Sequence, residues 1–172
     1  MGIDVFSADE QSVLPVDVPR WAHLTKCVLE AQHIRGDVEV SLLFVDELTI
    51  SSLNERFLGK SGPTDVLSFP LEDDFDPGGR SPDFGGTGPG ALPEGDQMLV
   101  LLGDIVICPT VAAKNAEEHQ VSFEDELALL VVHGILHLLG MDHEEDAEAE
   151  MMELRERELL AKFHVPASPP PA

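Results

Sequence analysis

Residues 122–143 read SFEDELALLVVHGILHLLGMDH, and this stretch predicts the central helix of the fold. Ser122, with Asp125 three positions later, makes a helix start similar to a capping box, with Asp in place of the usual Glu. The apolar run continues to Leu139, and Gly140 is placed to take the left-handed conformation that ends many helices. A leucine-rich helix with both ends marked is therefore expected.

The residues on either side predict a mixture of strands and helices. Alternating or wholly apolar runs indicate strands, and apolar residues three and four apart indicate helices. In the last helix, Met151, Leu154 and Leu159 are expected on one side. The class is α/β or α+β, with a mixed sheet of roughly four strands and about five helices. The expected strands cover residues 3–7, 37–45, 66–69 and 98–108, and the expected helices run from Pro19 to Gly36, from Asp46 to near Gly59, and over 110–120, 122–139 and 144–162.

One segment inside the chain has a different composition. Residues 71–97 hold seven acidic residues, one basic residue and many Gly and Pro, with almost nothing to bury. We expect a flexible acidic insertion there, because such a composition does not support a core. The prediction is a single domain over residues 1–165, followed by a disordered Pro-rich tail over 166–172.

Composition restricts the partners and the compartment. The 172 residues include 33 acidic and 10 basic ones, a formal charge of −23, which excludes a broad basic surface for RNA or for an anionic membrane. We find no secretory signal and no membrane span. Cys27 and Cys108 are far apart and outside any C-x-x-C motif, which favours reduced thiols and a cytoplasmic protein.

Three histidines have the spacing of a metal site. His133 and His137 are four residues apart, so on a helix their imidazoles lie on one face. Gly140 lets the chain turn back, which brings His143 toward the same ion. Three neutral nitrogens leave one open position on a tetrahedral zinc, the pattern of a catalytic site. The prediction is one Zn²⁺ per chain with a zinc-bound water as the catalytic group. The other four histidines, without such spacing, are expected at the surface: His23, His33, His119 and His164.

The spacing H-x-x-x-H-x-x-G-x-x-H is shared with the metzincin peptidases, which makes peptide hydrolysis an alternative. Those enzymes require Glu directly after the first His as a general base. The residue here is Gly134, which has no group to relay a proton. A metzincin-like peptidase is therefore disfavoured.

Three blocks of sequence resemble the YbeY family of bacterial endoribonucleases, also called rRNA maturation factors. Together with the order of the elements, the similarity covers most of residues 37–163. The blocks are His133-Gly-Ile-Leu-His137-Leu-Leu-Gly-Met-Asp-His143, Gly62-Pro-Thr-Asp-Val-Leu-Ser-Phe-Pro70 and Leu102-Gly-Asp-Ile-Val-Ile-Cys-Pro109.

The resemblance implies a metal-dependent endoribonuclease specific for single strands, acting in 16S rRNA 3′-end maturation and 70S ribosome quality control. It makes the three histidines the zinc ligands. Family members often carry a cleft Arg where this chain has Leu58. Arg56 lies two residues earlier, about 200° around a helix, and is a candidate phosphate contact. Lys60 is the candidate substrate-binding residue.

Two questions stay open at this point. The attacking group is either a metal hydroxide or the 2′-OH of the RNA. The chain is either an enzyme or a non-enzymatic, zinc-containing ribosome-assembly protein, whose acidic surface would suit basic ribosomal proteins. The expected partners are single-stranded precursor rRNA and the ribosome or its basic proteins, with no membrane, and the expected state is a monomer.

Overall fold

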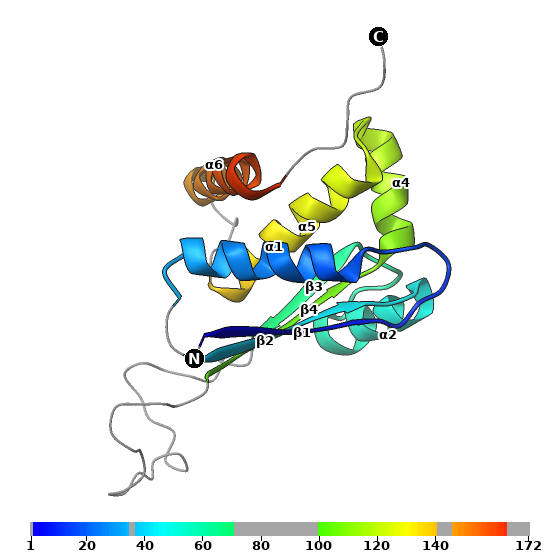
Figure 1. Cartoon of the computed structure of the whole chain (residues 1–172). Helices are drawn as coiled ribbons and strands as arrows, with labels where there is room; N and C mark the ends of the chain where they lie inside the picture. The colour runs from blue at the N-terminus through cyan, green and yellow to red at the C-terminus, as the bar shows by residue number, and fades with distance from the viewer. Residues whose placement is uncertain (1, 35–36, 71–99, 141–145, 165–172) are drawn as a thin grey trace, which may run out of the picture.

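Four strands and five helices follow one another in the part of the chain that the structure describes, as the sequence predicted. The computed structural model describes residues 2–34, 37–70, 100–140 and 146–164 (Figure 1). The predicted insertion over 71–97, the predicted tail over 166–172 and His143 lie outside these residues. The elements are β1 (Ile3–Asp9), α1 (Val18–Ala31), β2 (Val38–Phe44), α2 (Glu47–Leu58), β3 (Val66–Pro70), β4 (Val100–Ile107), α4 (Pro109–His119), α5 (Phe123–Leu138) and α6 (Asp146–Phe163).

The strands form one mixed sheet in the order β1-β2-β4-β3. β2 pairs in parallel with both β1 and β4, whereas β3 runs antiparallel to β4. Among the described strands, β3 therefore lies at an edge of the sheet. That edge carries the Gly62–Pro70 block that resembles the YbeY family.

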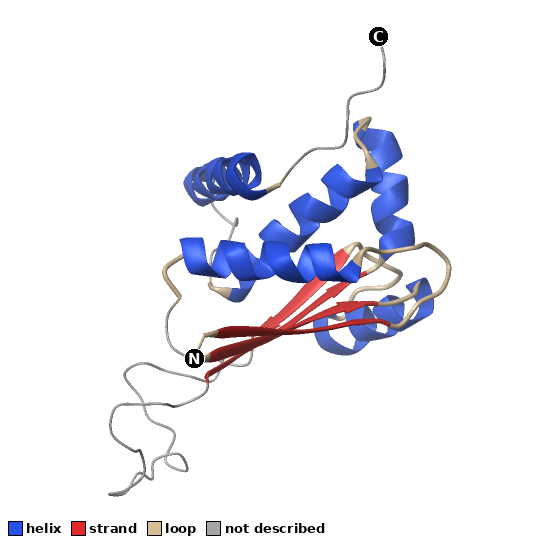
Figure 2. Ribbon diagram, in the orientation of Figure 1, coloured by secondary structure: helices blue, strands red, loops and turns tan. Residues whose placement is uncertain are grey.

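Helices cover both faces of the sheet. α1 and α5 lie over one face, α6 packs outside them, and α2 lies on the opposite face (Figure 2). Alternate residues of β2 are buried, Val38, Val40, Leu42 and Phe44, and they join the main core under α1 and α5. A smaller core beneath α2 contains Ile50 and Cys108. Ten of the sixteen residues of α5 are buried, which makes it the central helix that the sequence predicted.

The helix ends follow ordinary capping chemistry. The Asp46 carboxylate accepts the Thr49 N–H at 2.8 Å, and the Ser122 hydroxyl accepts the Asp125 N–H at 3.0 Å. Gly59 ends α2 in the left-handed conformation, with φ 68°. The predicted end of α1 at Gly36 is wrong: the helix stops at Ala31, because His33 takes the left-handed conformation, with φ 63°.

The predicted apolar side of α6 is also wrong. Met151 and Leu154 are 66% and 55% exposed, whereas Met152, Glu156 and Leu159 are buried. The buried positions follow an i, i+4, i+7 pattern with a carboxylate in the middle. A search for apolar periodicity cannot find such a face.

His164 is a third correction, because it is not a surface residue. Its side chain is only 8% exposed, and its Nε2 lies 2.8 Å from the Asp125 carboxylate. Its ring also lies against Trp21, with the ring centroids 6.2 Å apart. An isolated histidine gives no sequence pattern, and this one is brought to the core by the packing of α6 on α5 and α1.

His119 is exposed as predicted, but it pairs with a buried carboxylate. Glu126 is 2% exposed, and its Oε1 lies 3.0 Å from His119 Nδ1. That hydrogen bond, and then the negative charge of Glu126, raise the pKa of His119 above its ordinary value; Glu118 and Asp65 add to the effect. The pairing connects the end of α4 to the first turn of α5.

The β3–β4 pair requires a glycine at its crowded end. β4 has one extra residue, Leu102, opposite the junction of Glu39 and Val40 in β2. The next residue, Gly103, has φ 135°, and a Cβ there would lie 2.3 Å from the Phe69 carbonyl oxygen. Both the backbone conformation and the lack of space therefore exclude a side chain.

The described residues contain two free cysteines, partly exposed Cys27 and buried Cys108. Among the described helices, none is both long and apolar enough to cross a membrane.

Replacing Gly103 with Ala should destabilise the fold by at least about 2 kcal/mol, because a strained φ and a backbone clash act together. Gly59→Ala is the matched control: Gly59 has a positive φ but open space around it, so about 1 kcal/mol is expected. Urea unfolding measures both. Equal losses in the two variants would contradict the close approach at Gly103.

The His119–Glu126 pair should stabilise the fold in a pH-dependent way. Because the folded pKa of His119 is raised above its unfolded value of about 6.5, the contribution is fully present below that value and is lost as the pH rises through the folded pKa. The difference in unfolding free energy between wild type and His119→Ala should therefore shrink from pH 5.5 to pH 8.5. A difference that does not change with pH would contradict the pairing.

Candidate functional site

The candidate site lies where α5 packs against the β3 edge of the sheet. The Ser68 hydroxyl donates to the Gly134 carbonyl oxygen at 2.9 Å. A Cβ on Gly134 would lie 2.9 Å from Ile105 Cγ2, with Val66 and Ser68 also within 4 Å. Gly134 therefore lets α5 sit directly on β3 and β4. This close seating determines where the neighbouring residues of the helix point.

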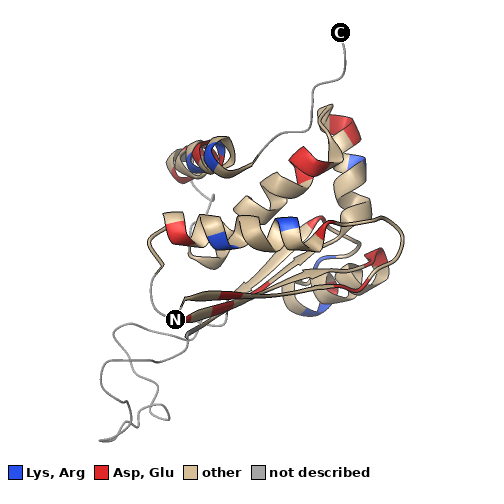
Figure 3. Cartoon of the chain, viewed as in Figure 1, with Lys and Arg blue, Asp and Glu red and all other residues tan. Residues whose placement is uncertain are grey.

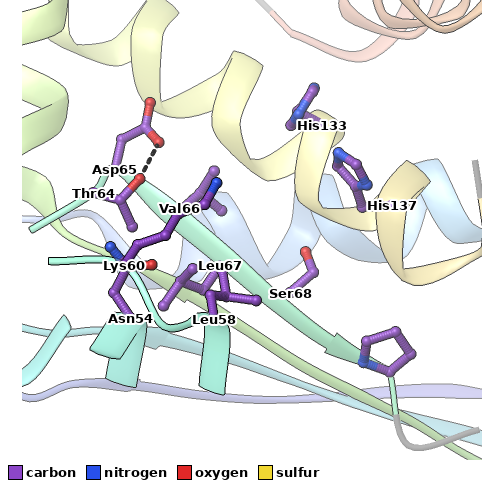
Figure 4. Close-up of a pocket in the computed structure, with 11 residues that line it drawn as sticks. Asn54, Leu58, Lys60, Thr64, Asp65, Val66, Leu67, Ser68, His133 and His137 are labelled. Carbon is purple, nitrogen blue, oxygen red and sulfur yellow. Dashed lines mark hydrogen bonds between the residues drawn. The ribbon is translucent and has the colours of Figure 1, made fainter. Parts of the chain in front are cut away.

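His133 and His137 extend from α5 beside β3, as their spacing predicted (Figure 4). Their rings are close and nearly perpendicular, with centroids 4.6 Å apart and an interplanar angle of 73°. His137 belongs to the last turn of α5, where the helix dipole favours a positive charge. Two imidazoles are thus presented together at a position that suits a cation.

A carboxylate from α6 meets the first histidine. Glu156 Oε2 lies 2.5 Å from His133 Nδ1, and the two side chains are 10% and 29% exposed. The sequence analysis missed Glu156, which lies among many acidic residues of α6 with no signal to separate it from them. Only the fold places it beside the histidine pair.

The residues present suit a zinc ion. The donors are imidazoles, and the Nδ1 of His133 is engaged by Glu156, which leaves Nε2 as the ligand atom. Within the described residues, no group of three or more His, Cys, Asp or Glu is arranged to hold a metal. The predicted third ligand, His143, lies outside them. The three-histidine site therefore stays a prediction, and the structure shows two of its members, His133 and His137, side by side.

A pocket of about 430 Å³ extends from the two histidines across β3 to the end of α2 (Figure 4). The segment between α2 and β3 forms one wall and is fixed at two points. Asn54 Nδ2 donates to the Gly62 carbonyl at 3.0 Å, and Asn115 Nδ2 donates to the Asp65 carboxylate at 3.0 Å. The lining residues are Asn54, Leu58, Lys60, Thr64, Asp65, Val66, Leu67, Ser68, Pro70, His133 and His137.

The two predicted cationic contacts differ in position. Lys60 lines the pocket, on the wall opposite the histidines, and so does Leu58. Arg56 is exposed on α2, with its guanidinium carbon 5.4 Å from the centroid of the Phe57 ring. It is not one of the described residues that line the pocket.

The structure also argues against a metzincin-like peptidase. The Cβ position of Gly134 points at Ile105 in β4. A glutamate at this position would collide with the sheet unless α5 moved away from it. The general base that a peptidase of that kind needs is therefore absent for a packing reason as well as a chemical one.

Comparisons with known proteins identify the family of this chain. The sequence model of the family described as "Endoribonuclease YbeY" matches residues 7–164. The chain belongs to the endoribonuclease YbeY family. A relative named endoribonuclease YbeY from Beutenbergia cavernae is 46% identical over 154 residues, covering 89% of this chain and 93% of the relative. One from Thermobifida fusca is 44% identical over 163 residues, covering 94% and 93%.

A solved structure gives the same fold. The solution structure of TM1509 from Thermotoga maritima matches with a TM-score of 0.52 and 29% identity, over 94% of this chain and 91% of that one. The family resemblance inferred from the three sequence blocks is thus confirmed along nearly the whole chain.

Proposed function

We propose that this chain is a zinc-dependent endoribonuclease that cleaves single-stranded RNA in the pocket between α5 and the end of α2. One observation carries the proposal: in a chain of the endoribonuclease YbeY family, a histidine pair and a lysine line the same pocket on opposite sides of an edge strand. We propose that its biological role is maturation of the 16S rRNA 3′ end and quality control of 70S ribosomes.

His133, His137 and His143 would hold the metal. When bound, zinc supplies a Lewis acid for a phosphoryl oxygen and lowers the pKa of a water molecule. The negative end of the α5 dipole supports a cation at this place. The family relationship and the adjacent imidazoles support this assignment.

Lys60 would bind the phosphate that is being cleaved. The family's usual cleft Arg is replaced by Leu58, which offers only apolar surface to the pocket. Lys60, two residues later, is a cation on the same wall. Its backbone N–H donates to the Asn54 carbonyl at 3.3 Å, so its attachment to the end of α2 is fixed although its side chain is exposed. We assign the phosphate contact to Lys60 in preference to Arg56.

The acidic surface favours delivery of the RNA by a partner. Acidic residues occur on every described helix, and they gather where α4 passes into α5 (Figure 3). Such a surface repels a polyanion except at a local cation. We propose that the chain works as a cytoplasmic monomer and meets its substrate on the ribosome, through basic ribosomal proteins.

The metal centre and the activity are tested together. Wild type should contain about one zinc per chain and cleave single-stranded RNA. His133→Ala should lose the zinc and at least about 100-fold of the cleavage rate, because the metal supplies several kcal/mol of stabilisation. His23→Ala, an exposed histidine on α1, is the matched control and should change neither value.

Equal cleavage by highly purified wild type and His133→Ala would identify a contaminating nuclease. That result would reject the enzyme function. Zinc in wild type without cleavage would instead support the non-enzymatic role in ribosome assembly.

The phosphate contact is tested by a pair of substitutions. Lys60→Ala should lower kcat/KM for single-stranded RNA about tenfold, equivalent to about 1.4 kcal/mol, with Lys60→Arg close to wild type. Arg56→Ala should stay within about twofold, because its side chain lies over Phe57 outside the pocket lining. Steady-state kinetics at fixed salt measures both. A larger loss in Arg56→Ala than in Lys60→Ala would reverse the assignment.

A further inference from the structure

Glu156 differs from the other acidic residues of α6. Glu150, Glu153 and Glu158 are exposed, whereas Glu156 is buried. A buried carboxylate is unfavourable unless it is paired and hydrogen-bonded. The partner here is His133, whose Nδ1 lies 2.5 Å from Glu156 Oε2. This contact joins α5 and α6 through two residues that are 23 positions apart in the sequence.

The position of Glu156 is fixed from both sides. Met152 and Leu159, one turn before and about one turn after it, are 2% and 1% exposed and anchor the buried face of α6. Arg155 fixes the rotation of the helix further: its Nε donates to Gln32 Oε1 at 2.5 Å, and its Nη2 donates to the Ala31 carbonyl at 3.3 Å. The backbone that carries Glu156 is therefore held in place by contacts other than the one to His133.

A histidine can bind a metal through one nitrogen only when that nitrogen carries no proton. A carboxylate near the other nitrogen accepts its N–H, which selects the tautomer and orients the ring. Glu156 is placed to do this at Nδ1 of His133, which leaves Nε2 for the metal.

We infer that Glu156 is a positioning residue for the metal centre: it holds His133 in the tautomer and orientation that bind zinc through Nε2. The inference rests on the proposed metal site at His133. It assigns a function to α6, a helix that supplies no residue to the pocket lining among the described residues.

The direct test measures zinc affinity by competition with a chromophoric chelator, using the full chain. Glu156→Leu should weaken zinc binding about 10- to 100-fold. The unfolding temperature of the zinc-free protein is measured beside it, because removing one partner of a buried pair can itself destabilise the fold; the loss of affinity counts for the inference where the zinc-free variant stays folded. Glu153→Gln, an exposed position on the same helix, should bind zinc as wild type does.

A second readout addresses the tautomer. In nitrogen NMR of the zinc-free wild type, His133 should carry its proton on Nδ1, and zinc-free Glu156→Leu should show a mixture of tautomers. If Glu156→Leu does not fold, Glu156→Gln replaces it. The amide oxygen still accepts the N–H but lacks the charge, so zinc binding should weaken by only about 3- to 10-fold.

The outcomes separate the two claims. If wild type binds one zinc and the Glu156 variants match it in affinity and in the His133 tautomer, this inference is overturned and the metal site stands. If wild type binds no zinc, or His133→Ala keeps it, the proposed metal site fails and this inference fails with it.

Discussion

The close seating of α5 on β3 and β4 is the contact on which the rest of the site depends. Because Gly134 has no side chain, the helix backbone can approach the sheet closely. The Ser68 hydroxyl donates a hydrogen bond to the Gly134 carbonyl oxygen. Once this position is fixed, the geometry of a helix places residues 133 and 137 side by side at the sheet edge. The same contact leaves no space for a metzincin-type glutamate at position 134. One packing constraint thus favours the histidine pair and excludes the rival chemistry.

The pocket combines three parts of the chain that are distant in sequence. α5 supplies the imidazoles, β3 supplies the floor, and the segment after α2 supplies Lys60. Two asparagine amides fix this segment, one from α2 and one from α4. A strongly acidic chain thereby places a lysine in the lining of this pocket without a broad basic surface. The charge of −23 limits where a polyanion can approach, and it does not exclude a polyanionic substrate.

Local signals in the sequence predicted much of the fold. Asp46 and Ser122 mark helix starts, β2 alternates, and α5 is apolar nearly all round, so each element was predicted from its own residues. The predictions failed where tertiary structure determines the end of a helix or which of its sides is buried. His33 ends α1 although it is not a glycine, and α6 turns Met152 inward and Met151 outward.

The candidate site was also predictable only in part. The i, i+4 spacing of His133 and His137 places both on one face from sequence alone, and Lys60 was a candidate by its nearness to Leu58. Glu156 was not predictable, because its position beside His133 depends on the rotation of α6 about its axis. That rotation is set by contacts with α1 and α5, which apolar periodicity does not encode. The third predicted ligand, His143, lies outside the described residues.

X-ray absorption at the zinc edge of the zinc-loaded full chain tests the central claim most directly. An open three-histidine centre predicts four light-atom ligands at about 2.0–2.1 Å, three of them with the multiple scattering of imidazole and the fourth an oxygen. A sulfur shell at about 2.3 Å, or fewer than three imidazoles, would contradict the account.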